Sequence, residues 1–93
     1  MKKYIYEILI ELSNIIFELK RVFNEGATET EYHFLCARMR NNLHNEKLIS
    51  QFQISEYQKA KTKILEMHEY PIDYSFDFDG KGPSHIRYGI VFN

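Results

Sequence analysis

Apolar residues recur with the spacing of a helix between residues 4 and 23. They fall at i, i+3, i+4 and i+7, which places them on one face of an α-helix, and they include Ile5, Ile8, Leu9, Leu12, Ile15, Ile16, Leu19, Val22 and Phe23. Tyr4, Tyr6, Ile10 and Phe17 widen this stripe beyond what one small core covers. The pattern predicts a long helix over 4–23 that forms a homodimer interface. A fully buried central helix is the alternative.

A second helix is predicted to start at Thr28. Gly26 suits the left-handed position that follows a helix, and Thr28 with Glu31 matches a capping box, in which the hydroxyl accepts from the backbone N–H three residues later. We expect its end at Asn41-Asn42. The positions expected to face the core are Tyr32, Leu35, Cys36 and Met39, with Phe34 packing beside them.

Two shorter helices are predicted next, over 46–53 and 56–69. Asn45 and Ser55 are the expected N-caps, and Ile54-Ser55 forms the turn between the helices. In the first, Leu48, Ile49 and Phe52 are expected to face inward. In a helix-turn-helix, the first helix braces the second, which enters the major groove of DNA by its N-terminal end. The order of elements therefore predicts this motif.

Residues 72–92 have the pattern of a β-hairpin. Residues 72–79 alternate strictly between apolar and polar, residues 80–84 carry the turn formers Gly and Pro, and residues 85–92 alternate again. Pro71 separates this part from the helices. The fold class predicted is α+β, a winged helix-turn-helix forming a single domain over residues 1–93. Its parts are the helix in 1–24, the helical core in 28–69 and the wing in 72–92.

The charge is distributed unevenly along the chain. The formal net charge is −1, yet residues 38–63 hold six Lys or Arg against two Glu, a balance of +4. A basic segment between acidic ends is typical of a local phosphate-binding face. An ordinary solvated helix face is the alternative. We expect phosphate contacts from Arg38, Arg40, Lys59, Lys61, Lys63 and Lys81.

Base recognition is expected at the start of the 56–69 helix. Gln58 can pair with adenine through two hydrogen bonds, and Ser55, Glu56 and Thr62 share the outward side with it. Arg87, near the hairpin tip, can reach the adjacent DNA backbone or minor groove. The partner predicted is double-stranded DNA, bound by a dimer that regulates transcription.

The chain resembles the MarR superfamily of winged-helix regulators, and within it the SarA-like branch. The resemblance rests on the long first helix, on ATETEYHFLCARM, on LISQFQISEYQKAKTKILEMHEYPID and on the closing YGIVFN. It implies dimeric DNA binding with the fourth helix in the major groove. By this resemblance Ser55, Glu56, Gln58, Lys59 and Thr62 would face bases or phosphates, and Arg87 would be the wing arginine.

Other chemistry finds little support in the sequence. The single cysteine, Cys36, cannot form an internal disulfide, fits a reducing cytosol and suits a helical core face better than a redox role. Glu7 and Glu11 interrupt the first apolar run, which argues against a signal peptide or a membrane span. We see no metal-ligand spacing, no cofactor motif and no nucleophile–base set, so we expect no metal, no cofactor and no enzyme.

A protein-binding role is the second functional hypothesis. The near-neutral net charge and the acidic face of the predicted strand, with Asp73, Asp77 and Asp79, favour a protein partner over DNA. In this reading the chain is a small inhibitor or interaction module from a mobile element.

Overall fold

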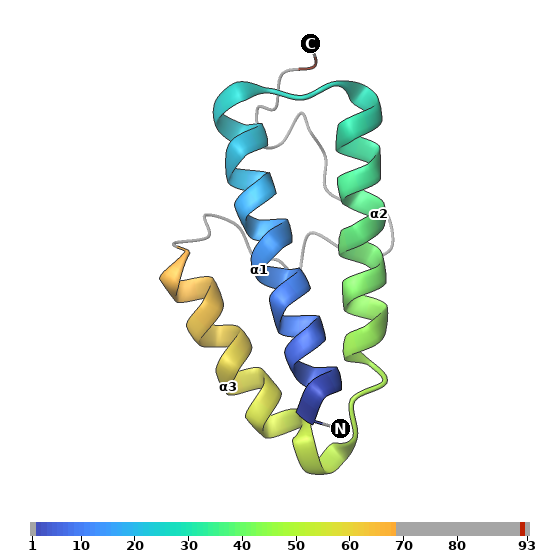
Figure 1. The fold of residues 1–93 in the computed structure, drawn as a ribbon, viewed down its shortest axis with the longest axis vertical. Helices are drawn as coiled ribbons and strands as arrows, with labels where there is room; N and C mark the ends of the chain where they lie inside the picture. The colour runs from blue at the N-terminus through green and yellow to red at the C-terminus, as the bar shows by residue number, and fades with distance from the viewer. Residues whose placement is uncertain (1, 69–91, 93) are drawn as a thin grey trace.

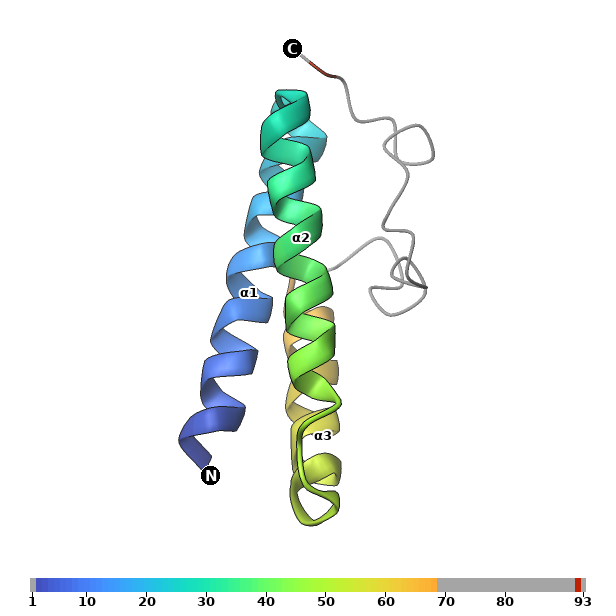
Figure 2. The same ribbon diagram turned by 90° about the vertical axis from the view of Figure 1, so that its right-hand side faces the viewer.

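The computed structural model describes residues 2–68 and residue 92. Within them it contains three α-helices, α1 (Lys2–Glu25), α2 (Glu29–Glu46) and α3 (Gln51–Met67), and no strand (Figure 1). In Figure 1, α1 lies between α2 and α3, while Figure 2 shows it to one side of the other two. The described part of the chain is therefore a small three-helix arrangement in which α1 packs against both α2 and α3.

Local chemistry fixes the connection between α1 and α2 as the sequence predicts. Gly26 has a φ of 78°, a left-handed conformation that is easiest for glycine, and its N–H donates to the Val22 carbonyl at 2.8 Å. Thr28 is the N-cap of α2, where its hydroxyl accepts from the Glu31 N–H at 3.1 Å. These two signals confirm the predicted boundary.

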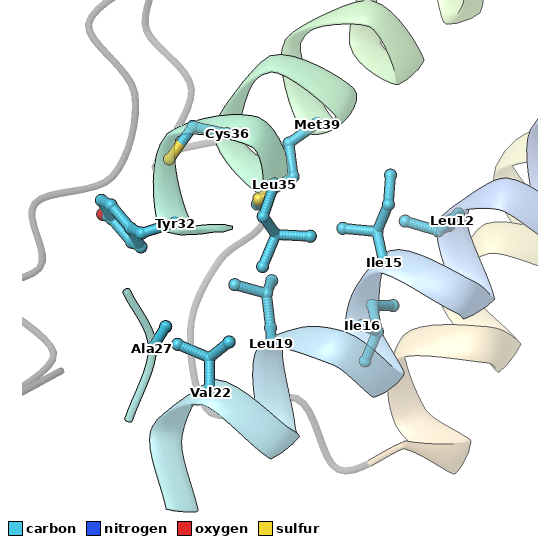
Figure 3. Packing of buried hydrophobic residues seen from close by; sticks show 10 residues of the cluster. All are labelled: Leu12, Ile15, Ile16, Leu19, Val22, Ala27, Tyr32, Leu35, Cys36 and Met39. Carbon is cyan, nitrogen blue, oxygen red and sulfur yellow. The ribbon is translucent and has the colours of Figure 1, made fainter. Parts of the chain in front are cut away.

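The larger core cluster fills the interface between α1 and α2. Figure 3 shows side chains of α1 pointing toward those of α2, with Ala27 at the connecting segment. Fully burying one Leu or Ile side chain contributes about 1.5–3 kcal/mol, so this interface is the main source of stability. The buried members are Leu12, Ile15, Ile16, Leu19, Val22, Ala27, Tyr32, Leu35, Cys36 and Met39.

A smaller cluster attaches α3 to α1. Tyr57 of α3 is fully buried against Ile5, Ile8 and Leu9, near the start of α1. Farther along, the Ser13 hydroxyl and His68 Nε2 share a hydrogen bond of 2.9 Å. These contacts lie in the same order along both helices, so α3 runs parallel to α1, whereas α2 runs antiparallel to it.

The winged helix-turn-helix prediction is wrong. The two predicted helices over 46–53 and 56–69 are replaced by one continuous helix, α3, so the turn expected at Ile54-Ser55 is absent and Ser55 lies inside the helix. Neither glycine nor proline occurs between residues 47 and 70, so nothing in that segment forces a break. The predicted hairpin over 72–92 lies outside the described residues except for Phe92, which forms an isolated parallel bridge with Ala27.

The end of the second helix also differs from the prediction. Asn41 and Asn42 do not end α2, which continues to Glu46 and includes the predicted cap Asn45. Asn42 is 1% exposed, and its Nδ2 donates to the Ile8 carbonyl of α1 at 3.1 Å. Asn42 therefore joins two helices, whereas the sequence pattern had indicated the end of a helix there. None of the three helices is long and apolar enough to cross a membrane.

Candidate functional site

The outer face of α3 carries five of the eleven residues predicted to contact DNA. A shallow hollow of about 510 Å³ lies on this face. The residues of this hollow that were predicted to contact DNA are all exposed, because they lie on the side of α3 that faces away from the buried Tyr57. The hollow is lined by Ser55, Gln58, Lys59, Thr62, Lys63 and Glu66. The structure thus brings five of the predicted residues together, with one acidic side chain among them.

Lys61 does not belong to that face. Only 4% of its surface is exposed, and its Nζ lies 2.6 Å from Glu46 Oε2. This ion pair joins the end of α2 to the middle of α3. Lys61 is therefore placed where it holds two helices together, and its charge is not presented at the surface.

The remaining predicted residues are scattered. Arg38 of α2 is held by Glu11 of α1, with its Nε 2.9 Å from Glu11 Oε1, and its Nη1 lies 3.8 Å from Glu18 Oε1. Arg40 is exposed on α2, and Glu56 lies apart from the hollow, in a small depression next to Tyr6. Lys81 and Arg87 lie outside the described residues.

These placements weaken the basic surface that the sequence suggested. Two of the six cations in residues 38–63, Arg38 and Lys61, are paired with carboxylates. Lys59 and Lys63 remain on the outer face of α3, where Glu66 offsets part of their charge. Some basic side chains of residues 38–63 therefore form ion pairs between helices, and others lie on a helix face with a modest positive charge.

A second surface runs along the outer side of α1. Tyr6, Ile10 and Phe17 are 58%, 61% and 67% exposed. At 100° per residue they lie within about 40° of each other around the helix axis. Between Ile10 and Phe17, the residues nearest this side are the exposed Asn14 and Ser13, which bonds to His68, and neither carries a charge. We call Tyr6, Ile10 and Phe17 the outer stripe.

Several other large apolar side chains are exposed, contrary to the prediction for three of them. Phe34, Leu48 and Phe52 were expected to face the core but are 66%, 62% and 98% exposed. The cause for Leu48 and Phe52 is the missing short helix: Leu48 lies in the turn between α2 and α3, and Phe52 in the first turn of α3. Spacing alone did not distinguish Phe34 from its buried neighbour Leu35.

Two buried side chains have perturbed acidity. Burial raises the pKa of the Tyr57 phenol above its ordinary range, and the neighbouring Glu46 carboxylate adds to the rise. No hydrogen bond to the Tyr57 hydroxyl is formed within the described residues. Burial also raises the pKa of the Cys36 thiol, although Tyr32 and the charge of Arg40 partly offset it. A protonated, buried thiol is a poor nucleophile, so Cys36 behaves as a core residue.

No group of three or more His, Cys, Asp or Glu that could hold a metal ion occurs in residues 2–68 and 92. Comparison of the chain with models of protein families, with curated proteins and with solved structures finds no match. The resemblance to SarA-like regulators therefore stays a prediction, although the fold that it implied is wrong.

Proposed function

We propose that this chain is a helical protein-interaction module that pairs with a second copy of itself through the outer stripe of α1. The supporting observation is that Tyr6, Ile10 and Phe17 are each more than half exposed on one side of a helix, and that no charged residue lies on this side between Ile10 and Phe17. Clustered apolar side chains on a surface mark sites of protein contact, and the centres of such sites are depleted in charged residues.

The shape of the outer stripe suits an identical partner. Tyr6 and Phe17 lie eleven positions apart in the sequence, which is about 16 Å along a helix. Two such helices crossing antiparallel about a two-fold axis place Tyr6 of each copy near Phe17 of the other, with Ile10 toward the centre. A two-fold contact of this kind uses the same patch on both copies and closes at the dimer.

Sedimentation equilibrium of the full chain tests this proposal. We expect a monomer–dimer equilibrium at roughly 0.1 mM protein, which Phe17→Ser shifts to the monomer because it removes a large apolar contact. Phe52→Ser is the matched control, since it removes the same side chain from a fully exposed position on α3, and it should leave the dimer intact. A monomeric wild type, or equal loss in both variants, would refute pairing through the outer stripe.

Double-stranded DNA is the second candidate partner, favoured by the grouping of Ser55, Gln58, Lys59, Thr62 and Lys63 on the outer face of α3. The test is binding to labelled duplexes at several salt concentrations. Lys59→Ala should weaken binding to every sequence and lower the salt slope by about one unit. Lys47→Ala is the control, because Lys47 is exposed in the turn before α3. Duplex binding that is insensitive to salt and to Lys59 would exclude this role.

We also propose the reducing cytosol as the location, where Cys36 stays a thiol.

A further inference from the structure

A polar cleft lies along the interface between α1 and α2, separate from both surfaces described above. Its volume is about 420 Å³, within the range of small-molecule sites, roughly 300–1,000 Å³. Ile8 and Asn42 are its most buried residues and form its floor. The bond from Asn42 Nδ2 to the Ile8 carbonyl joins the two helices beneath it.

Two contacts between the helices hold the cleft open. At one end the Tyr4 hydroxyl donates to the Asn45 carbonyl at 3.2 Å. Farther along, the Arg38 guanidinium is bound to the Glu11 carboxylate. Because these bonds fix the spacing of α1 and α2, the cleft is formed before any ligand arrives, and binding need not order it.

The charge of the lining favours a cation. The lining holds two carboxylates, Glu7 and Glu11, against one cation, Arg38, and Arg38 is paired with Glu11, so Glu7 is the charge left for a ligand. Arg38 is engaged by Glu11 and also lies 3.8 Å from Glu18, so it is not available to an anion. No described side chain forms an ion pair with Glu7, whose carboxylate is exposed at the cleft.

The neutral part of the lining indicates which kind of cation fits. Asn41 and Asn45 lie one turn apart on α2 and line the cleft together with Glu7, and their side-chain amides offer acceptor oxygens. Phe34 lies seven residues before Asn41, about 10 Å along the helix, and supplies an exposed aromatic ring. The cleft thus has several acceptors toward one end and an apolar wall toward the other.

We propose that this cleft binds an arginine-type ligand, with its guanidinium group near Glu7, Asn41 and Asn45 and its apolar part toward Phe34. A guanidinium offers five N–H donors in one plane and is more weakly hydrated than an ammonium group, so it satisfies the carboxylate and the amide oxygens together. The group belongs either to a free small molecule or to an arginine side chain of a protein partner.

The test is a titration of the full chain with Nα-acetyl-arginine methylamide, followed by ¹H–¹⁵N NMR. We expect saturable shifts of Glu7, Asn41 and Asn45 with a Kd of about 1 mM, the affinity ordinary for a ligand of this size. The citrulline analogue has nearly the same shape without the charge, and it should bind at least about tenfold more weakly, because it loses a charge-assisted contact.

Two variants locate the site. Glu7→Gln should weaken binding of the arginine probe about fivefold to tenfold, and Phe34→Ala about twofold to fivefold, because it removes the apolar wall. Glu25→Gln removes the same charge at the other end of α1 and should leave the affinity unchanged. Equal binding of the arginine and citrulline probes, or an unchanged affinity in Glu7→Gln, would overturn the proposal.

A second titration distinguishes the two sources of the guanidinium. A short peptide with one central arginine that binds more than about tenfold tighter than the free probe identifies an arginine side chain of a protein partner. Equal affinities identify a small molecule, and either result keeps the site. The cleft does not include the outer stripe, so failure of this proposal would leave pairing through α1 unaffected.

Discussion

The two sides of α1 have similar amino acids but opposite surroundings. On the inner side, Leu12, Ile15 and Ile16 are fully buried by α2 and by the apolar residues of α3. On the outer side, Tyr6, Ile10 and Phe17 are more than half exposed. The same hydrophobic chemistry therefore stabilises the fold on one side and remains available for contact on the other.

This difference shows what a wide apolar stripe means in a small protein. Within one copy, α2 and α3 cover only part of the circumference of α1. Residues outside that part remain exposed, even when they are apolar. The sequence predicted a stripe too wide for one core, and the described helices leave part of it open. The following four predictions test this division, from the largest expected change in stability to the smallest.

The inner side of α1 should be the most sensitive to truncation. Leu12 is 0% exposed, so Leu12→Ala removes buried methyl groups and leaves a cavity. We expect a loss of about 3 kcal/mol in the free energy of unfolding, measured by urea denaturation with the far-UV signal of the helices. A loss below about 1 kcal/mol would mean that α1 and α2 do not pack as described.

The attachment of α3 should depend on its buried ion pair. The Glu46 side chain is only 14% exposed, and Lys61→Ala removes its partner at 2.6 Å. We therefore expect a loss of about 2–3 kcal/mol in the free energy of unfolding, measured by urea denaturation. Replacing both residues, as Glu46→Leu with Lys61→Met, should restore most of the stability, because no buried charge is left unpaired.

Lys59→Ala is the control for the ion pair. This lysine lies two residues before Lys61 on the exposed side of α3, and its removal should change stability by less than about 0.5 kcal/mol. Similar losses in Lys59→Ala and Lys61→Ala would contradict the burial of Lys61.

Tyr57 should make the fold sensitive to alkaline pH. Its pKa is raised in the folded state by burial, so the folded protein holds this proton after the unfolded chain has released it. The stability linked to Tyr57 is therefore fully present below the ordinary tyrosine pKa of about 10 and is lost as pH rises above it.

Tyr57→Phe removes both the titration and a buried hydroxyl without a described hydrogen bond. We expect stability at neutral pH to stay equal or to rise by up to about 1 kcal/mol. Thermal melts from pH 8 to about pH 11 should show a flatter decline than in the wild type. An unchanged alkaline decline would mean that Tyr57 is not the responsible group, and Cys36→Ala is then the informative comparison.

The outer stripe should contribute least to the stability of the monomer. Phe17 is 67% exposed, so Phe17→Ser should change the free energy of unfolding by less than about 0.5 kcal/mol when it is measured at a concentration too low for pairing. Its effect should appear only as protein concentration rises, through loss of the dimer's contribution to stability. Strong destabilisation at low concentration would place Phe17 in the core.

Helices with strong local signals were predictable from the sequence. Periodicity gave the buried residues of α1, and Gly26 with Thr28 gave the boundary of α2, because each signal acts within a few residues. The buried residues Tyr32, Leu35, Cys36 and Met39 were also predicted from their spacing.

The segment after Met39 was not predictable in the same way. Asn42 bonds to α1, thirty-four residues away in sequence, and Lys61 pairs with Glu46 on another helix. Such tertiary contacts override the local tendency of asparagine to end a helix and of lysine to face solvent. The same holds for the candidate site. The residues on the outer face of α3 could be predicted together because they share one helix. That Arg38 and Lys61 form ion pairs with carboxylates of other helices depends on packing, which the local sequence does not show.

The most direct test of pairing through α1 is an intermolecular NOE experiment on a mixture of isotopically labelled and unlabelled copies of the full chain. The account predicts cross-peaks from the Ile10 methyl groups of one copy to the aromatic rings of Phe17 or Tyr6 in the other. Cross-peaks from Phe52 instead, or none at concentrations where the protein sediments as a dimer, would contradict it.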